Sequence, residues 1–357
     1  MNKRYGITAA GTWVADYTKI ITQFPEEGSC TVIEKEQVNN GGAPYNLLID
    51  LRRLDADFPL RAIGCIGHDV DGSNILKDCI AHQIDVSGIH LIPDKPTSFS
   101  DVVTSIRSGV RTSFNQPGAN AALSEAHFDF SQNTSRLFYL GTILFLAGLD
   151  APHPKHGTQA ARVLARARKA GLMTCVDIER CSHVSNDEFR SAAMAALRQS
   201  DLIVINAEVS ELLTGIRIRQ STGVDVQAVV DSAHELLNKT GADCVVVRFP
   251  AGAVGITREG QITAEGGVRL PKSRIVNASG AGHAFMAGFL FRYHDGLPLN
   301  ECLKSGHAAA AACLMDSSAS GGIRRITTCL KLLESYGQRE IDLIGLHHTP
   351  KALQKVI

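Results

Sequence analysis

The segment Ile275-Val-Asn-Ala-Ser-Gly-Ala-Gly-His-Ala-Phe-Met-Ala-Gly-Phe-Leu290 places two glycines directly before an apolar helical pattern. Gly280 and Gly282 allow the backbone to approach a ligand closely, and the free N–H groups at a helix start attract anions. The segment therefore predicts an anion-binding turn, although glycines also precede many helices for packing reasons alone. One helix face is predicted to carry Phe285, Met286, Phe289, Leu290 and Tyr293.

The rest of the chain predicts an α/β fold with a mostly parallel sheet. Continuous apolar strands that alternate with amphipathic helices indicate a sheet covered by helices on both faces. Apolar runs typical of buried strands occur at Tyr5–Ala10, Leu60–Ile66, Arg136–Leu140, Met173–Asp177, Leu202–Ile205 and Cys244–Arg248. Helical patterns between them include Asn46–Leu54, Gly157–Ala170 and Val226–Thr240.

Two segments break this alternation of strands and helices. Residues 28–38 and 97–114 alternate apolar and polar side chains, which is typical of half-exposed antiparallel strands. We expect them to form a small sheet that projects as a lid over the binding edge, and a hairpin without function is the alternative. The lid is assigned to residues 13–38 and 97–117, the α/β domain to residues 1–12, 39–96 and 118–331, and a C-terminal tail to residues 332–357.

Apolar side chains on the expected lid predict self-association. Val32, Val102 and Val110 lie in the alternating segments. Open strand edges and exposed sheet faces invite pairing with another chain. We therefore expect a homodimer formed through the lid.

The composition argues against two classes of binding partner. The 357-residue chain has 36 Lys+Arg and 36 Asp+Glu, so it lacks the basic excess expected of a nucleic-acid binder. No apolar run reaches the roughly 18 residues that cross a bilayer, so no membrane partner is expected.

Nine cysteines are spaced singly, without a Cys-x-x-Cys pair, which predicts reduced thiols in a cytoplasmic protein.

Further glycine-containing motifs precede the Gly280 turn along the chain. They are Gly11-Thr-Trp-Val-Ala-Asp16, Asn40-Gly41-Gly42-Ala-Pro-Tyr-Asn46, Gly64-Cys-Ile-Gly67-His-Asp69-Val-Asp-Gly72, Gly118-Ala-Asn120 and Glu211-Leu-Leu-Thr-Gly215. In this order they resemble the motifs of the PfkB/ribokinase family of carbohydrate and nucleoside kinases, from about residue 5 to about residue 325. The resemblance implies a ribokinase-like three-layer α/β/α domain with a small β-sheet lid.

The same resemblance implies ATP-dependent phosphoryl transfer to a hydroxyl group, usually a CH2-OH, of a sugar or nucleoside. It places the transferring phosphoryl group on the backbone N–H groups of Gly280, Ala281 and Gly282. The cofactors that it implies are ATP, Mg2+ and K+. The residues implied for substrate binding are Asp16, Asn40, Gly41, Gly42, Asn46 and Asn120. Those implied for nucleotide binding are Asn206, Arg248, Gly252 and His307, the last in place of a late asparagine.

The chain departs from the family pattern on the catalytic and nucleotide sides. Its signature ends Gly-Ala-Gly-His, so His283 occupies the position of the aspartate that accepts the hydroxyl proton. Asn277 replaces an aspartate that helps to hold a monovalent cation in many members. Val209 stands where a magnesium-organising glutamate is expected, which makes the adjacent Glu208 the candidate ligand. The loop at residues 249–252 is one residue short.

His283 leaves two hypotheses open. A neutral imidazole, with an ordinary pKa of about 6.5, can accept a proton, and the positive end of a helix favours the neutral form. An imidazole nitrogen lies farther from its Cα than a carboxylate oxygen, and an error of about 1 Å can cost on the order of 100-fold in rate. The chain is therefore an active kinase with His283 as its base, or a pseudokinase that binds a sugar or nucleoside without phosphoryl transfer.

Overall fold

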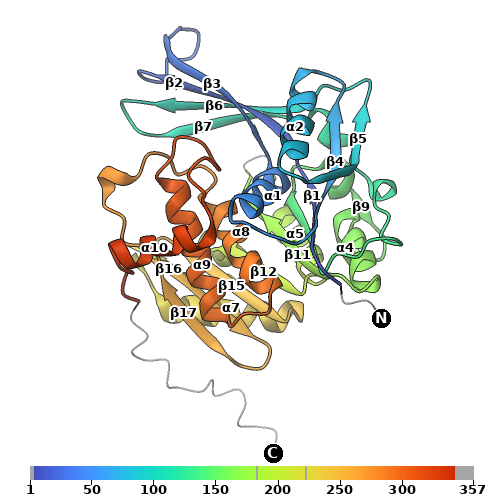
Figure 1. Ribbon diagram of the computed structural model, residues 1–357, viewed down its shortest axis with the longest axis vertical. Coiled ribbons are helices and arrows are strands. Elements are labelled where there is room, and N and C mark those ends of the chain that lie inside the picture. The colour runs from blue at the N-terminus through green and yellow to red at the C-terminus, as the bar shows by residue number, and fades with distance from the viewer. Residues whose placement is uncertain (1–3, 182–183, 222, 342–357) are drawn as a thin grey trace, which may run out of the picture.

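A nine-stranded sheet forms the centre of the protein in the computed structural model, which describes residues 4–181, 184–221 and 223–341 (Figure 1). The strand order is β17-β16-β15-β12-β11-β8-β1-β4-β5. Neighbours from β5 to β15 pair in parallel, whereas β15, β16 and β17 pair antiparallel. The predicted α/β fold with a mostly parallel sheet is confirmed. The strands are β1 Ile7–Gly11, β4 Leu60–Gly67, β5 Asp85–Ile92, β8 Leu137–Ile143, β11 Met173–Ile178, β12 Leu202–Asn206, β15 Cys244–Phe249, β16 Gly252–Thr257 and β17 Ile262–Gly266.

Alternating side chains of the central strands build a core on both faces of the sheet. In β8, Leu137 and Tyr139 belong to one buried cluster, and Phe138 and Leu140 belong to the other. The first cluster is closed by α1 Ala43–Arg53, α2 Val70–Ala81, α8 Ala281–His294, α9 Leu299–Leu314 and α10 Ile326–Tyr336. The second is closed by α3 Ala147–Asp150, α4 Gln159–Lys169, α5 Asn186–Leu197, α6 Ala207–Thr214 and α7 Val226–Thr240.

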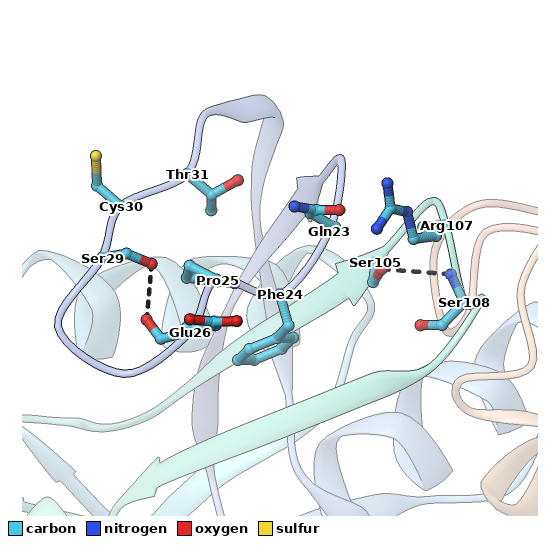
Figure 2. Close-up of a pocket in the computed structure, with 10 residues that line it drawn as sticks. All are labelled: Gln23, Phe24, Pro25, Glu26, Ser29, Cys30, Thr31, Ser105, Arg107 and Ser108. Carbon is cyan, nitrogen blue, oxygen red and sulfur yellow. Dashed lines mark hydrogen bonds between the residues drawn. The ribbon is translucent and has the colours of Figure 1, made fainter.

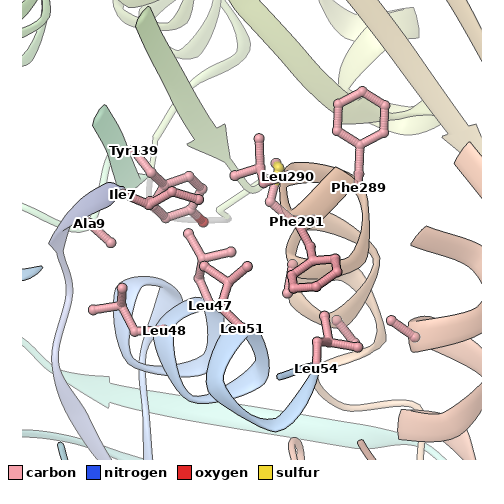
Figure 3. Close-up of a cluster of buried hydrophobic side chains, with 14 of the residues drawn as sticks. Ile7, Ala9, Leu47, Leu48, Leu51, Leu54, Tyr139, Phe289, Leu290 and Phe291 are labelled. Carbon is pink, nitrogen blue, oxygen red and sulfur yellow. The ribbon is translucent and has the colours of Figure 1, made fainter. Parts of the chain in front are cut away.

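Helices α1 and α8 lie side by side in the first layer. Figure 3 shows Leu47 and Leu51 of α1 beside Leu290 and Phe291 of α8, close to Ile7 of β1. Each fully buried leucine contributes roughly 1.5–3 kcal/mol relative to an exposed one. This packing fixes the first turn of α8 next to α1, although the two helices are far apart in the sequence.

A four-stranded sheet forms the lid and projects from the main domain at the top of Figure 1. The predicted antiparallel strands are confirmed where β3 pairs with β2 and where β6 pairs with β7, whereas the central pair, β2 and β6, runs parallel. Both strands follow parallel strands of the main sheet, β1 and β5, and therefore leave its carboxyl edge in the same direction. The lid order is β3-β2-β6-β7, with β2 Val14–Ile21, β3 Ile33–Gly41, β6 Ser98–Ser105 and β7 Arg111–Gln116.

The valines expected on the open face of the lid differ in exposure. Val32 is 68% exposed and Val110 is 59% exposed. Val102 is only 3% exposed, so the prediction that it lies on an open face is wrong. Alternate residues of β6 point to opposite sides of the lid, and Val102 belongs to the covered side.

The remaining elements are short, and the last helix extends past the expected domain end. Residue 332, where the tail was expected to begin, lies inside α10, because Leu332 and Leu333 pack against the core. Residues 342–357 of that tail lie outside the described residues.

The short elements are hairpins β9 Pro152–His153 with β10 Gly157–Thr158 and β13 Arg219–Gln220 with β14 Gly223–Val224, and the 3-10 helices η1 Gly118–Ala122, η2 Glu125–His127 and η3 Lys272–Arg274.

Candidate active site

The carboxyl edge of the parallel sheet carries the polar groups of the candidate site. Asp177 is the second-last residue of β11, and Arg248 is the second-last residue of β15. The loop after β1 leads into β2 of the lid, which carries Asp16. Ligands of open α/β sheets bind in the crevice at this edge. The fold therefore brings together residues from the lid, the sheet and α8.

The first turn of α8 has the geometry predicted for an anion-binding turn. Gly280 caps the helix with φ 81°, a left-handed conformation that favours glycine. A Cβ atom at Gly280 would lie 2.5 Å from the carbonyl oxygen of Ala319, so no larger residue fits without movement. The N–H groups of the first helical turn have no partner inside the helix. Gly280, Ala281 and Gly282 thus offer backbone donors at the positive end of α8.

His283, in the same turn, contacts α1 and β11 through different ring nitrogens. Its Nδ1 lies 3.5 Å from Nδ2 of Asn46, and its Nε2 lies 3.7 Å from Oδ2 of Asp177. The Asp177 carboxylate also accepts a hydrogen bond from Oγ1 of Thr142 at 3.2 Å. Since Asp177 favours a proton on Nε2, the lone pair of Nδ1 faces the Asn46 side. The His283 side chain is 23% exposed, which leaves it accessible.

The charge around His283 opposes the expectation of a neutral imidazole. Burial disfavours the charged ring, but the carboxylates of Asp177, Glu179 and Asp50 outweigh burial, so the pKa of His283 is raised. The carboxylates of Asp177, Glu179 and Asp50 therefore oppose the effect of the helix end, which favours the neutral ring, and they were not visible in the local sequence. Burial alone would raise the pKa of Asp177. His283 and Arg248 outweigh burial, so the pKa of Asp177 lies below its ordinary value.

Asp16 and Gly41, two residues that the sequence predicts to bind substrate, lie against each other. A Cβ atom at Gly41 would lie 2.3 Å from Oδ2 of Asp16, so glycine is needed for the carboxylate to take this place. Burial raises the pKa of Asp16 to about 6, against the opposing effects of Arg111, His283 and Ser100. Asp16 is therefore mostly ionised above that pH and can accept hydrogen bonds from hydroxyl groups.

Two arginines approach the glycine turn from different sides. The guanidinium of Arg248 lies over the Phe285 ring, 5.4 Å from its centroid, and a Cβ at Gly282 would be 3.1 Å from its Nη1. Arg111 of the lid strand β7 donates a hydrogen bond to Oγ of Ser279, directly before the turn. Both arginines therefore add positive charge beside the backbone N–H groups of the turn.

Three of the predicted asparagines are engaged by neighbouring backbone. Asn120 accepts from the N–H of Trp13 at 3.0 Å and donates to its carbonyl at 3.1 Å, so it holds the β1–β2 loop. Asn40 donates to the carbonyl of Asn74 at 3.4 Å. Asn206 caps α6 and accepts from the N–H of Val209 at 2.8 Å. Each of the three asparagines therefore has a backbone partner within hydrogen-bond distance.

The predicted nucleotide and metal residues also contact neighbouring protein groups. His307 is 8% exposed, burial lowers its pKa to about 4, and its Nε2 lies 3.0 Å from the carbonyl oxygen of Glu265. Glu208 is 53% exposed and lies 3.9 Å from Arg219. Asn277 donates to Ser317 and accepts from Ser279. Gly252 opens β16, where a Cβ would lie 2.4 Å from the carbonyl oxygen of Glu265.

Asp177, Asp50 and Arg111 are residues of the site that sequence reasoning missed. Asp177 ends a predicted parallel strand, and that position was a usable signal. Asp50 stands four residues after Asn46 in a predicted helix, so a shared helix face was also readable. Arg111 lies in a predicted lid strand, with no local signal of its contact partner.

A separate hollow lies at the tip of the lid (Figure 2). It is formed by the loop at residues 23–31 and the turn at residues 105–108. Its hydrogen bonds are local, such as the one from Oγ of Ser29 to the carbonyl of Glu26. The hollow contains none of the residues that surround His283, so we do not assign it to the active site.

Comparisons with known proteins agree with this architecture. In the described part of the chain, no helix has both the length and the apolar character needed to cross a membrane. A ribokinase of Haemophilus influenzae is 24% identical over 336 residues, covering 93% of this chain and 99% of that protein. A nucleoside kinase of Methanothermobacter thermautotrophicus is 23% identical over 336 residues, covering 90% and 94%.

A solved structure shares the fold of this chain. Arabidopsis thaliana ribokinase, complexed with ribose and ATP, superposes with a TM-score of 0.73 at 21% identity and covers 93% of this chain and 99% of that chain. Residues 9–325 match the family described as "pfkB family carbohydrate kinase". With the two-layered helical cover, the lid and the glycine turn in place, the chain belongs to the pfkB family of carbohydrate kinases.

Proposed function

We propose that this protein transfers a phosphoryl group from ATP to a hydroxyl group of a sugar or nucleoside. The observation that carries the proposal is the meeting of the Gly280–Gly282 turn with the His283–Asp177 pair at the carboxyl edge of the sheet. The ribokinase and nucleoside kinase relatives, each matched over most of its length, support this substrate class.

The acceptor hydroxyl would be oriented by Asp16 and Asn46. Asp16 supplies a carboxylate from the lid, and Asn46 supplies a side-chain amide from α1, 3.5 Å from His283. Since Asp16 has a pKa of about 6, it is available as an acceptor in neutral solution. Orienting the acceptor beside the base makes the attack effectively intramolecular, which is a large part of enzymatic rate enhancement.

His283 would take the proton of the hydroxyl group as its oxygen attacks phosphorus. Neutral His283 can accept on Nδ1, while the Asp177 carboxylate fixes Nε2–H and stabilises the imidazolium that forms. A raised pKa makes the imidazole a stronger base, although a smaller fraction of it is neutral at low pH. The departure from aspartate at position 283 is thus compatible with base catalysis.

The transferring phosphoryl group would bind the N–H groups of Gly280, Ala281 and Gly282, with Arg248 and Arg111 nearby. Mg2+ bound with ATP would neutralise phosphate charge, and Glu208 is the candidate carboxylate for it. K+ would be held near Asn277. Among residues 4–181, 184–221 and 223–341, no three His, Cys, Asp or Glu side chains are grouped to hold a metal, so most Mg2+ ligands would be phosphates and water.

The lid would close the site and pair with a second copy. β2 and β7 carry Asp16 and Arg111 to the site, so the lid can exclude water that competes as an acceptor.

The exposed valines Val32 and Val110 favour a homodimer through the lid. Light scattering at micromolar concentration is expected to show a dimer, and a monomer for the double variant Val32→Lys, Val110→Lys. A monomeric parent protein would contradict this.

A reducing compartment suits the thiols of the chain. All nine cysteines lie in the described part of the chain as free thiols, and only Cys30 is exposed. Unpaired cysteines are typical of reducing compartments. We infer a cytoplasmic location, which fractionation of the native host would test.

A substrate screen tests the proposed function directly. Purified protein with ATP and Mg2+ is offered a panel of sugars and nucleosides, and ADP and phosphate-ester formation are measured together. We expect ester formation with at least one member, dependent on His283. Ligand binding without any ATP binding in calorimetry, and without ester formation, would instead identify a pseudokinase.

A further inference from the structure

Asp50 is a buried carboxyl group that the proposed function has not used. It lies in the middle of α1 at 0% exposure, and neither carboxyl oxygen has a hydrogen-bond partner among the described residues. Oδ1 of Asn46 and Oγ of Ser320 are also buried without a partner in that part of the chain. Burying an ionised carboxylate without compensation costs several kcal/mol. Asp50 is therefore either protonated or stabilised by a positive group nearby.

The positive group with the right position is His283. Asn46 and Asp50 are four residues apart on α1 and therefore share a helix face. That face meets the first turn of α8, where Nδ2 of Asn46 lies 3.5 Å from Nδ1 of His283. A second cation that acts on Asp50 is Arg53, whose guanidinium donates to the carbonyl of Ser320 at 2.6 Å. Arg53 is thus already hydrogen-bonded elsewhere.

We propose that Asp50 is a positioning residue that makes His283 a stronger base, acting from α1 while Asp177 acts from β11. This inference rests on the proposed function. As the acceptor oxygen bonds to phosphorus, its O–H bond breaks and the proton goes to Nδ1 of His283. The phosphorus–oxygen bond to the ADP leaving group breaks in the same transfer, and ADP departs with that electron pair. The imidazolium is then stabilised by a carboxylate on each side.

The electrostatics of the two groups are reciprocal, as linkage requires. Burial raises the pKa of Asp50 to about 7, while the positive charges of His283 and Arg53 oppose the rise. Asp50 in turn raises the pKa of His283. The charged groups that face His283 are Asp177 and Glu179 from the β11 end, Asp50 from α1 and Asp16 from the lid. Around Asp50 the further titratable groups are the thiols of Cys313 and Cys329.

The variant Asp50→Asn tests this inference without requiring activity. It keeps the shape of the side chain and removes its charge. The His283 imidazole is followed by NMR as pH is varied, with its signal assigned by loss in His283→Gln. We expect its pKa to fall by at least about 0.5 units. In an active enzyme, the acid limb of kcat/KM must move the same way, and this shift must vanish in the His283→Gln background.

Asp316→Asn is the matched control. Asp316 and Asp50 both act on the thiol of Cys313, but only Asp50 acts on His283. The control is expected to leave the pKa of His283 unchanged. An unchanged His283 pKa in folded Asp50→Asn, or an equal shift in Asp316→Asn, overturns the inference.

Two further outcomes keep this test separate from that of the proposed function. If Asp50→Asn does not fold, the titration of His283 is measured in the wild type instead. His283 must then titrate in two steps, because Asp50 changes charge in the same pH range. A single-step titration then overturns the inference. If the pKa shift is found but no substrate is phosphorylated, the coupling of Asp50 to His283 holds and the proposed kinase activity fails.

Discussion

Nε2 of His283, at the start of α8, lies 3.7 Å from Oδ2 of Asp177, at the end of β11. The resemblance to the family implies a carboxylate at position 283, and the imidazole that stands there lies beside a carboxylate of β11. The pair resembles a general base with its orienting acid, in which the acid selects the tautomer and stabilises the protonated ring. Position 283 therefore has to be interpreted together with Asp177.

Asp177→Asn is expected to reduce kcat/KM by on the order of 100-fold or more, because general-base help is worth roughly 10²–10⁴ in rate. The amide neither stabilises the imidazolium nor selects Nε2–H with the same strength. The pKa of His283 is expected to fall, so the acid limb of the pH profile moves to lower pH. Steady-state kinetics from pH 5 to 9 measure both effects. An unchanged pH profile would show that the pair is not involved in proton transfer.

His283→Asp is expected to lower turnover, although it introduces the residue that the family resemblance implies at this position. The new carboxylate would stand beside Asp177, Glu179 and Asp50 and lose the attraction that holds the imidazole. Like charges at this distance raise a carboxyl pKa and weaken it as an ionised partner. Rates are compared with those of His283→Ala, which has no base. A large gain in turnover for His283→Asp would identify the native histidine as a disabling change.

Wild-type kcat/KM is expected to rise with pH through the pKa of His283, with a midpoint above the ordinary value of about 6.5. The value of kcat/KM rises with pH because His283 can accept a proton only in its neutral form. Ionisation of Asp16, with its pKa of about 6, contributes to the rise at lower pH. A profile that falls over this range would exclude His283 as a general base.

Much of the fold was predictable because its signals are local. The run Val226–Thr240 has helical spacing and a capping aspartate just before it, and the observed helix has the predicted bounds. The glycine turn was predictable because glycine is the residue that most readily adopts a positive φ, and Gly280 has a φ of 81°. Parallel pairing followed from continuous apolar strands such as β12.

The chemistry around the turn was not predictable, because it depends on contacts between distant segments. Asn46 and His283 are 237 positions apart and meet only because α1 packs against α8. The pKa of His283 is raised by carboxylates from two distant segments, Asp50 of α1 and Asp177 with Glu179 near the end of β11, whereas the sequence pattern showed only the helix end. The parallel pairing of β2 with β6 also required the direction in which both leave the main sheet.

Gly280→Ala is expected to lower kcat/KM by on the order of 100-fold, because the turn must shift by about 1 Å to relieve the contact with Ala319. Gly260→Ala is the matched control. Gly260 has a similar φ of 88° but no neighbour within 4 Å of its Cβ position. The control is expected to lose about 1 kcal/mol of stability with unchanged activity. Equal activity losses in the two variants would show that the Gly280 turn has no special role.

Arg111→Ala is expected to raise KM for ATP about 10-fold, since it removes one charge-assisted contact worth roughly 1.5 kcal/mol or more beside the glycine turn. Arg107→Ala is the control, because Arg107 lies on the same lid but at its tip, in the hollow of Figure 2. Thermal unfolding is expected to change little in both, since both side chains are on the surface. A similar KM change for Arg107→Ala would indicate a general charge effect.

Asp50→Asn is expected to be more stable than the wild type at pH 8, by on the order of 2–4 kcal/mol, and to differ little near pH 4. The pKa of Asp50 is about 7 in the folded protein, against about 3.9 for an unfolded aspartate. Between these values the folded state holds a proton that the unfolded state has released, so wild-type stability falls as pH rises. The amide has no proton to release and escapes this loss. Urea unfolding at both pH values measures the difference, and a variant less stable than the wild type at pH 8 would show that the Asp50 carboxylate is stabilised in the core.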